Sequence, residues 1–393
     1  MFRPFYGWLF NPEVVPDVAK VTSPPYDVIT EDKHQELIAR SEYNIVRLLL
    51  PGRDASSYAK AAAALDEWRT KKVLVRDPSP RFYLYESDYL GNDDDLRTAW
   101  GIFGALAVVP FGEAVVPHEK TIDDHRDDRL ALLTATRANL DPIIGLTGAH
   151  ELPGLVRTAE LVPRLAFDDS DGSRHRLFDI TDEDTIGQVQ AAINAHPITI
   201  ADGHHRYTTA LRYKERMGAA ERRGGSEAIM AMVSPAEGSG LTIDPYHRLL
   251  PAIEVDRDLI EVDFAVSRVD AEPPSEPGTL VVVTASESFL LRPRPEALNR
   301  ISPPLREAGA AVANDILYPR LGLDESAARY TASAAEAIGA ARGGYEIAIL
   351  VAPVSESAVA AAGEMGIRFP TKTTHFNPKP RAGLVVRYFD GIG

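Results

Sequence analysis

The sequence predicts a mixed α+β protein with an appended α/β unit toward its C-terminus. Two stretches of β-forming residues, 82–109 and 161–182, each contain an acidic, glycine-containing turn, as antiparallel hairpins do. Segments such as 58–71 place apolar residues at helical spacing. From about residue 251, apolar β-branched runs return together with an alanine-rich helical segment, which indicates a further unit of strands and helices.

The composition is that of a globular chain with ample material for a core. Its 393 residues are 45% hydrophobic and 25% charged, and this length suggests roughly two or three structural units. We expect an N-terminal α+β region over 1–160, a core over 161–250 and a C-terminal α/β region over 251–393. The formal net charge of −15 argues against nucleic acid as a partner, because phosphate backbones need a basic surface.

Cysteine content and hydropathy indicate the compartment. The chain has no cysteine, which excludes disulfides, zinc–thiolate sites and a cysteine nucleophile, and which is compatible with a reducing cytoplasm. No window approaches about eighteen consecutive apolar residues, and residues 1–5 lack the charged start and long apolar core of a signal peptide. We therefore expect a cytoplasmic protein without membrane contact, and homo-oligomers stay possible.

The first fifty residues contain one stiff turn and two expected elements. The run 23–27, S-P-P-Y-D, includes a Pro-Pro step that fixes an extended backbone and presents Tyr26 and Asp27. The alternative is a plain loop that packs Tyr26 against the core. Residues 30–41 have the start signals of a helix, and the apolar run 45–50 before a proline predicts a strand.

A cluster of chemically versatile side chains follows the apolar pair at 115–116. After Pro117 come an imidazole, a carboxylate, an ammonium and a hydroxyl, those of His118, Glu119, Lys120 and Thr121. At a strand end, such a cluster can combine a general base with a phosphate-binding lysine. The aspartates of 123–127 are more simply the solvated start of a helix over about 130–139, where the helix dipole favours acids.

The densest chemistry lies in the turn 201–206, between a short β-branched strand at 198–200 and a helix that follows. Gly203 permits a positive φ or a close backbone approach. His204, His205 and Arg206 open the helix, where backbone N–H groups and a guanidinium together favour a phosphate. The alternative is an ordinary strand–turn–helix with a surface histidine pair and Asp202 making local hydrogen bonds.

A basic, hydroxyl-rich loop lies near the C-terminus of this acidic chain. It runs over 371–375 and is followed by Lys379 and Arg381. An ordinary surface loop is the default interpretation, and a loop that folds over a phosphate is the alternative.

Several common motifs are absent. The sequence has no G-x-x-x-x-G-K-[ST], no G-x-G-x-x-G, no D-F-G and no H-E-x-x-H. The triplet at 125–127, H-R-D, has a leucine, Leu132, where a protein-kinase catalytic loop has asparagine. A P-loop fold, a protein kinase and a zinc protease are therefore without support.

The turn D-G-H-H-R with Ala210 resembles the G-x-x-R-x-x-x-A motif of the ParB and sulfiredoxin superfamily. The absence of cysteine excludes sulfiredoxin chemistry here. The wider chain resembles a bacterial family catalogued as a domain of unknown function (DUF1015-like) and associated with ATP-dependent free-serine kinases. The segments that carry this resemblance are S-P-P-Y-D-V at 23–28, P-H-E-K-T at 117–121, D-R-L at 128–130, the turn at 202–206, F-P-T-K at 369–372 and P-K at 378–379.

The resemblance implies a ParB/sulfiredoxin-like nucleotide-binding core and a small-molecule kinase that uses ATP or ADP with Mg²⁺. The acceptor that it implies is a small hydroxyl compound, with free L-serine as the leading candidate. The residues expected to bind phosphate are Gly203, His204, His205, Arg206, Lys120 and Thr121. Glu119 or Asp202 would take the hydroxyl proton, with His118 beside them in the catalytic group.

The same hypothesis assigns Tyr26, Asp27, Arg47 and Lys372 to substrate binding and names no side chain as a metal ligand. It expects the segment 118–119 and the turn 202–206 to face one pocket. Two alternatives stay open. One is a nucleotide-binding switch without turnover of a metabolite, and the other is a metal-dependent phosphohydrolase with His118, His204 and His205 as ligands.

Overall fold

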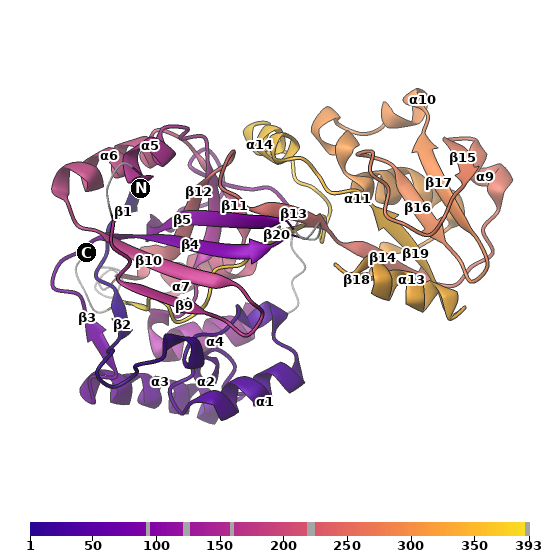
Figure 1. The fold of residues 1–393 in the computed structure, drawn as a ribbon. Coiled ribbons are helices and arrows are strands. Elements are labelled where there is room, and N and C mark those ends of the chain that lie inside the picture. The colour runs from indigo at the N-terminus through magenta and orange to yellow at the C-terminus, as the bar shows by residue number, and fades with distance from the viewer. Residues whose placement is uncertain (92–94, 121–125, 158–160, 218–224, 390–393) are drawn as a thin grey trace. The chain divides into compact units, whose positions relative to one another are not determined.

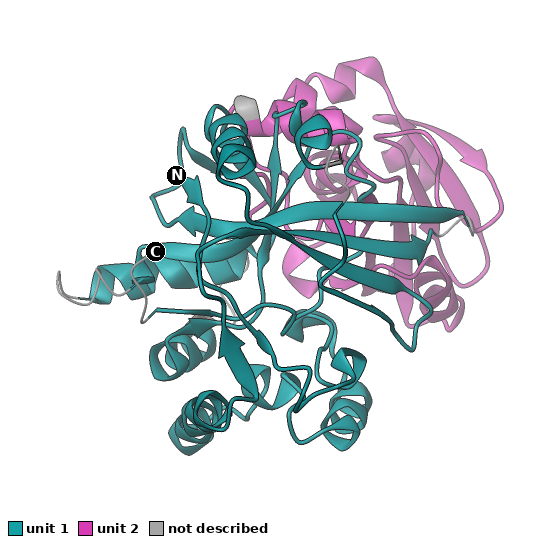
Figure 2. Ribbon diagram, turned by 60° about the vertical axis from the view of Figure 1, so that its left-hand side comes forward, with its two compact units in different colours: residues 1–116, 123–241, 378–393 teal, residues 117–122, 242–377 magenta. Residues whose placement is uncertain are grey.

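The computed structural model describes residues 1–91, 95–120, 126–157, 161–217 and 225–389. The chain forms two compact units, shown in Figure 2. Unit 1 comprises residues 1–116, 123–241 and 378–393, and unit 2 comprises residues 117–122 and 242–377. The expected regions 1–160, 161–250 and 251–393 remain a prediction of domain organisation.

A large mixed sheet forms the centre of unit 1 (Figure 1). Within the described residues it has nine strands in the order β6-β11-β8-β12-β5-β4-β10-β9, and β1 pairs with β5. Of the strands in this path, β12 and β8 run parallel, whereas β4, β5 and β10 form antiparallel ladders. The strands are β1 (Phe2–Arg3), β4 (Phe82–Leu90), β5 (Leu96–Ala107), β6 (Val115–Pro117), β8 (Ile143–Thr147), β9 (Leu165–Asp168), β10 (Arg174–Ile180), β11 (Ile198–Asp202) and β12 (Ala228–Pro235).

Helices complete unit 1, with α1 to α4 gathered on one side of the sheet and α5 and α6 on the other (Figure 1). One core packs Phe2, Trp100 and Tyr207 against the sheet, and a second packs Leu65 and Trp68 among the helices. The remaining elements are α1 (Glu31–Arg40), α2 (Val46–Leu49), α3 (Ala55–Thr70), α4 (Arg126–Thr136), α5 (Leu152–Arg157), α6 (Glu183–Asn194), α7 (His204–Arg216), the 3₁₀ turns η1 (Val18–Lys20) and η2 (Tyr26–Val28), and the two-stranded pairs β2 (Trp8–Phe10) with β3 (Leu74–Arg76) and β7 (Ala138–Asn139) with β21 (Arg387–Tyr388).

Unit 2 is built on an antiparallel sheet in the order β15-β17-β16-β19-β14-β18, next to a short β13–β20 pair. Helix α13 packs on this sheet through Ala337 and Ala341, which are fully buried. The elements are β13 (Thr242–Pro245), β14 (His247–Pro251), α9 (Arg257–Glu261), β15 (Phe264–Arg268), β16 (Leu280–Val283), β17 (Ser288–Pro293), α10 (Pro295–Leu298), η4 (Pro303–Glu307), α11 (Gly309–Val312), η5 (Ala313–Leu317), α12 (Tyr318–Leu321), η6 (Glu325–Ala327), β18 (Arg329–Thr331), α13 (Ala334–Arg342), β19 (Glu346–Val351), α14 (Glu356–Glu364) and β20 (Thr374–Asn377).

The predicted α+β class is confirmed, and most expected elements are present. The two hairpins are β4–β5 and β9–β10, and the central turn joins β11 to α7. Thr30 caps α1 by accepting a hydrogen bond from the backbone N–H of Lys33, as its start signals indicate. None of the described helices has the length and hydropathy needed to cross a membrane.

The strand expected at 45–50 is wrong, because this run forms the short helix α2. Asn44 sets the turn by accepting the backbone N–H of Val46 and donating to the carbonyls of Lys20 and Thr22. Val46, Leu48 and Leu49 are buried. A short apolar run suits a buried strand and a buried helix equally well, so neighbouring contacts such as those of Asn44 decide between them.

Candidate functional site

Four segments that are far apart in the sequence meet in unit 1 around the start of α7. They are the 26–27 turn, the 128–129 pair at α4, the 202–206 turn and Lys379, and each belongs to a segment that carried the resemblance. The segment that contains Lys379 is held there by two backbone hydrogen bonds between Ser23 and Ala382, at 2.9 and 3.2 Å. This ladder holds the 378–382 segment beside the 26–27 turn.

The backbone of the 202–206 turn requires glycine at its centre. β11 ends at Asp202, and its pairing with β8 shifts register between Ile200 and Asp202. Gly203 then has φ +90°, and a Cβ at this position would lie 2.7 Å from the Cγ2 atom of Ile143. Both the left-handed conformation and the close approach exclude a larger residue. This geometry turns the chain directly into α7.

Arg206 is held between two carboxylates at the base of this turn. Its guanidinium lies 2.8 Å from Asp141 and 2.6 Å from Asp202, and it also donates to the carbonyl of Pro142. Lys379 lies 2.8 Å from the other oxygen of Asp202 and contacts Asp27 as well. Asp202 therefore bridges two cations. We call Asp27, Asp141, Asp202, Arg206 and Lys379 the charged cluster.

Burial and pairing shift the pKa values of the cluster in different directions. Burial alone would raise the pKa of Asp202, but Lys379 and Arg206 outweigh it and hold that pKa well below its ordinary value. Burial raises the pKa of Asp141, which Arg206 offsets only in part. The aspartates overcome the effect of burial on Arg206 and Lys379 and raise both pKa values. At neutral pH Asp202, Arg206 and Lys379 are all charged.

Tyr26 and Arg129 continue the site from the charged cluster. The guanidinium of Arg129 lies 4.6 Å from the centre of the Tyr26 ring, and that of Arg206 lies 5.9 Å from it. Arg129 is fixed by a 2.8 Å bond to Asp128 and another to the carbonyl of Leu49. Burial outweighs the effects of the neighbouring charges and raises the pKa of Tyr26 to about 12, so its hydroxyl stays protonated.

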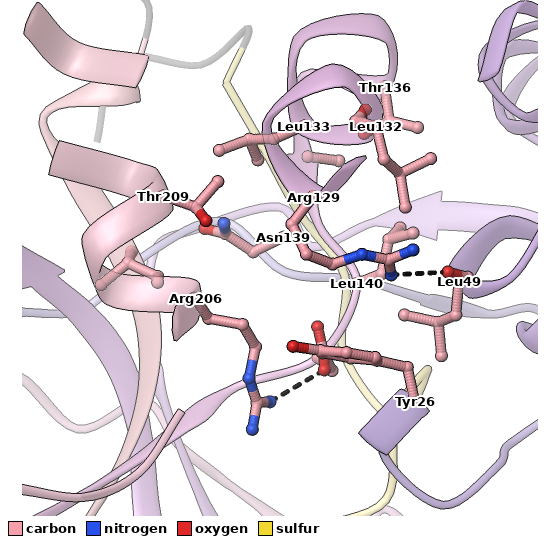
Figure 3. A pocket seen from close by; sticks show the side chains of 13 residues that line it. Tyr26, Leu49, Arg129, Leu132, Leu133, Thr136, Asn139, Leu140, Arg206 and Thr209 are labelled. Carbon is pink, nitrogen blue, oxygen red and sulfur yellow. Dashed lines mark hydrogen bonds and ion pairs between the residues drawn. The ribbon is translucent and has the colours of Figure 1, made fainter. Parts of the chain in front are cut away.

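A pocket opens beside these side chains, between α4 and α7 (Figure 3). It encloses about 510 Å³ of empty space, open solvent at its mouth included. Arg206 and Thr209 reach it from α7, and Arg129 and Leu132 reach it from α4 (Figure 3). Its lining consists of Tyr26, Leu49, Arg129, Leu132, Leu133, Thr136, Ala138, Asn139, Leu140, Asp141, Arg206, Thr209 and Ile229.

The P-H-E-K-T motif belongs to unit 2, where Glu119 is bound to the loop 372–374. Its carboxylate accepts the backbone N–H groups of Lys372, Thr373 and Thr374 at 2.7, 3.1 and 3.2 Å. It also accepts the hydroxyl of Thr374 at 3.0 Å, and His118 lies 2.7 Å from that same hydroxyl. Glu119 thus holds the loop in place, and Lys372 takes φ +54° there.

The other candidates each have their own contacts or lie outside the described residues. Lys120 is exposed, and its backbone N–H donates to the carbonyl of Phe369. The ammonium of Lys372 lies 4.9 Å from the centre of the Tyr246 ring. Arg47 donates to the carbonyls of Ile38 and Ser41 at the end of α1. Thr121 lies outside the described residues.

His204 and His205 open α7, as expected, and His204 is buried. Among the described residues, no three His, Cys, Asp or Glu side chains are placed to hold a metal ion. The carboxylates of the charged cluster are paired with Arg206 and Lys379.

Sequence reasoning missed two residues of this site, Asp141 and Thr209. Asp141 stands before Pro142 and has the local sequence of an exposed turn, so no signal marked it. Thr209 lies one turn after Arg206, and a helical projection of 204–216 would have placed both on one face.

Comparison with protein families identifies the chain. A family described as "Protein of unknown function (DUF1015)" matches residues 2–314. The chain belongs to this family. Membership in DUF1015 confirms the resemblance carried by the segments at 23–28, 117–121, 128–130 and 202–206.

The DUF1015 chain is also similar to solved structures at low identity. A conserved hypothetical protein from Pyrococcus furiosus is 13% identical with a TM-score of 0.37, and the match covers 71% of this chain and 94% of that one. C-terminally truncated SbnI from Staphylococcus aureus is 11% identical, with a TM-score of 0.38 and coverages of 71% and 84%. A free serine kinase in complex with AMP is 15% identical, with a TM-score of 0.35 and coverages of 71% and 92%. No curated protein matches the sequence.

Proposed function

We propose that this protein is a phosphotransferase that moves a phosphoryl group from ATP or ADP to a small hydroxyl acceptor. Free L-serine is the leading candidate for this acceptor. The observation that carries the proposal is the bridged pair of cations, Arg206 and Lys379, at the start of α7 beside the pocket. Guanidinium and ammonium groups at a helix start are the partners that phosphate oxygens take in proteins. The D-G-H-H-R resemblance supports the same assignment.

Phosphate oxygens would replace carboxylate oxygens around these cations. Asp141 and Asp202 neutralise Arg206, and Asp27 and Asp202 neutralise Lys379. A di- or triphosphate offers more charge and more acceptor oxygens than one aspartate. The carboxylates therefore preorganise the cations and keep them charged until the nucleotide binds.

Asp202 is the base that this proposal favours. Its pKa is low because Lys379 and Arg206 contact it, and a carboxylate with a low pKa is a weak base. When phosphate engages the two cations, the pKa of Asp202 rises and the group can accept the hydroxyl proton of the acceptor. Glu119, the other candidate, already accepts four hydrogen bonds from 372–374. This pattern suits an anchor for the loop better than a base.

The remaining roles follow from position. His204 and His205 open α7 next to Arg206 and would line the phosphate subsite with Gly203. Tyr26 and Asp27 would bind the acceptor, since Asp27 reaches Lys379 from the opposite segment. A role in substrate binding or catalysis for His118, Lys120, Thr121, Arg47 and Lys372 remains a prediction.

Mg²⁺ fits this site as an ion that arrives with the nucleotide. It takes oxygen ligands and usually binds one or two carboxylates together with substrate phosphates. Asp27 would hold it together with phosphate oxygens once Lys379 moves to the phosphates, which leaves Asp202 free to act as the base. Bound there, the ion would neutralise charge on the transferred group.

Phosphorus NMR tests the proposal. The protein is mixed with Mg²⁺, with ATP or ADP in turn, and with L-serine, or with L-alanine as an acceptor that lacks the hydroxyl. We expect a new phosphomonoester resonance in the mixture that contains serine and none in the mixture that contains alanine. Consumption of nucleotide without that resonance would indicate hydrolysis or another acceptor, and binding without consumption would indicate a switch. Either result would contradict a serine kinase.

A further inference from the structure

Thr209 carries a buried hydroxyl without a hydrogen-bond partner. It lies on α7 and is only 3% exposed, and its Oγ1 atom has no partner among the residues that the structure describes. A threonine inside a helix commonly donates to the carbonyl three or four residues before it. Burying a hydroxyl without any partner costs free energy. The position of Thr209 in the pocket wall suggests that a ligand supplies the missing partner.

A second threonine in the same pocket provides the contrast. Thr136 lies on α4 and is similarly buried, at 7% exposed. Its hydroxyl donates to the carbonyl of Leu132 at 2.9 Å, so its own helix satisfies it. Within the described part of the chain the hydroxyl of Thr209 lacks such a bond, although both threonines line the pocket (Figure 3).

The pocket wall around Thr209 is largely apolar. Three of its lining residues are charged, Arg129, Asp141 and Arg206, and six are aliphatic, among them Leu132, Leu140 and Ile229. Free serine has almost no apolar surface to set against such a wall. A nucleobase has flat apolar faces and a polar edge, which is the complement of an aliphatic pocket that contains a few polar groups.

We propose that this pocket receives the base of the nucleotide and that the hydroxyl of Thr209 hydrogen-bonds to the polar edge of the base. The inference rests on the proposed function and deepens it, because it separates a base subsite at Thr209 from a phosphate subsite at Arg206. A hydroxyl donates and accepts, so Thr209 can pair with either kind of atom on the base. Both residues lie on α7, three positions apart, so one helix sets the spacing of the two subsites.

Calorimetric binding of two probes tests the inference. ADP carries the base, and inorganic pyrophosphate carries the phosphates alone. T209V keeps the shape of the side chain and removes the hydroxyl, and we expect it to weaken ADP binding by roughly tenfold and leave pyrophosphate binding unchanged. T209S, which restores a hydroxyl, should recover most of the ADP affinity. T134V is the matched control, because Thr134 lies on α4 outside the pocket lining and its hydroxyl donates to the carbonyl of Leu130, and it should change neither affinity by more than about twofold.

The alternatives give different results. The inference would be overturned if T209V bound ADP as tightly as the wild type does. It would also be overturned if T209V lost affinity for ADP and for pyrophosphate by the same factor. If the wild-type protein binds pyrophosphate as tightly as ADP, the base subsite fails while the phosphate subsite stands. If it binds neither, the proposed function fails with it. Thermal unfolding reports on folding, and T209V should melt no lower than the wild type because the hydroxyl that it removes has no hydrogen bond to any described residue.

Discussion

At the scale of single residues, Asp202 determines the charge balance of the site. It is the carboxylate that contacts both Arg206 and Lys379, at 2.6 and 2.8 Å. The three groups are largely buried, so their charges are weakly screened. Removing one partner of such a buried set leaves the others uncompensated, and this costs more than the pair contributes when intact.

We predict that D202N lowers the free energy of unfolding at pH 7 by about 3 kcal/mol. The pKa of Asp202 is lower in the folded chain than its unfolded value of about 3.9, so its stabilising effect is complete above that pH. The effect is lost as the pH falls toward the folded pKa. Urea unfolding should therefore show the gap between wild type and D202N narrowing below about pH 4.

Asp141 serves as the control, because its pKa shifts in the opposite direction. Burial raises that pKa, so ionising Asp141 weakens the fold as the pH rises through it. D141N should therefore cost less stability at pH 7 than D202N does. If D141N and D202N lowered the free energy of unfolding by equal amounts at every pH, this account of the charged cluster would be contradicted.

At the scale of elements, the turn from β11 into α7 positions the phosphate subsite. The turn depends on the left-handed backbone of Gly203 and on the close packing of Ile143. Three of the five side chains of the charged cluster come from β11, α7 or the segment before β8. A change of backbone at Gly203 would therefore move Asp202 and Arg206 apart.

We predict that G203A lowers the free energy of unfolding by about 2 kcal/mol, from the strain of φ +90° together with the clash against Ile143. Gly187, inside α6, is the matched control because a Cβ there meets nothing within 4 Å. G187A should stabilise the protein by up to about 1 kcal/mol. Denaturant unfolding of both variants measures the difference, and a neutral G203A would show that the turn tolerates a side chain.

The elements also show where sequence patterns decide the structure and where they do not. Thr30 and Asp182 each cap the helix that follows them, so α1 and α6 could be predicted closely. The run 45–50 could not, because hydrophobicity alone does not separate a buried helical turn from a buried strand. Its conformation depends on Asn44, whose side chain bonds across to residues 20 and 22.

At the scale of the whole molecule, the path of the chain limits what the sequence reveals about the site. The motifs at 26–27, 128–129, 202–206 and 378–379 could be recognised, and their meeting in unit 1 could not. Their proximity depends on the return of 378–393 to unit 1 after unit 2. No change of composition marks that return. Asp141 escaped notice for a related reason, since only the pairing with Arg206 gives it a role.

Binding of ADP and pyrophosphate to R206K tests the central claim most directly. Lysine keeps the positive charge for Asp141 and Asp202 but lacks the planar fork that binds phosphate oxygens in pairs. R212A is the matched control, because Arg212 lies on the same helix with a more exposed side chain and pairs with the exposed Asp127 at 3.9 Å. We expect R206K to weaken both ligands by at least about tenfold and R212A to leave both unchanged. If R206K binds both ligands as tightly as the wild type does, the charged cluster is not the phosphate site.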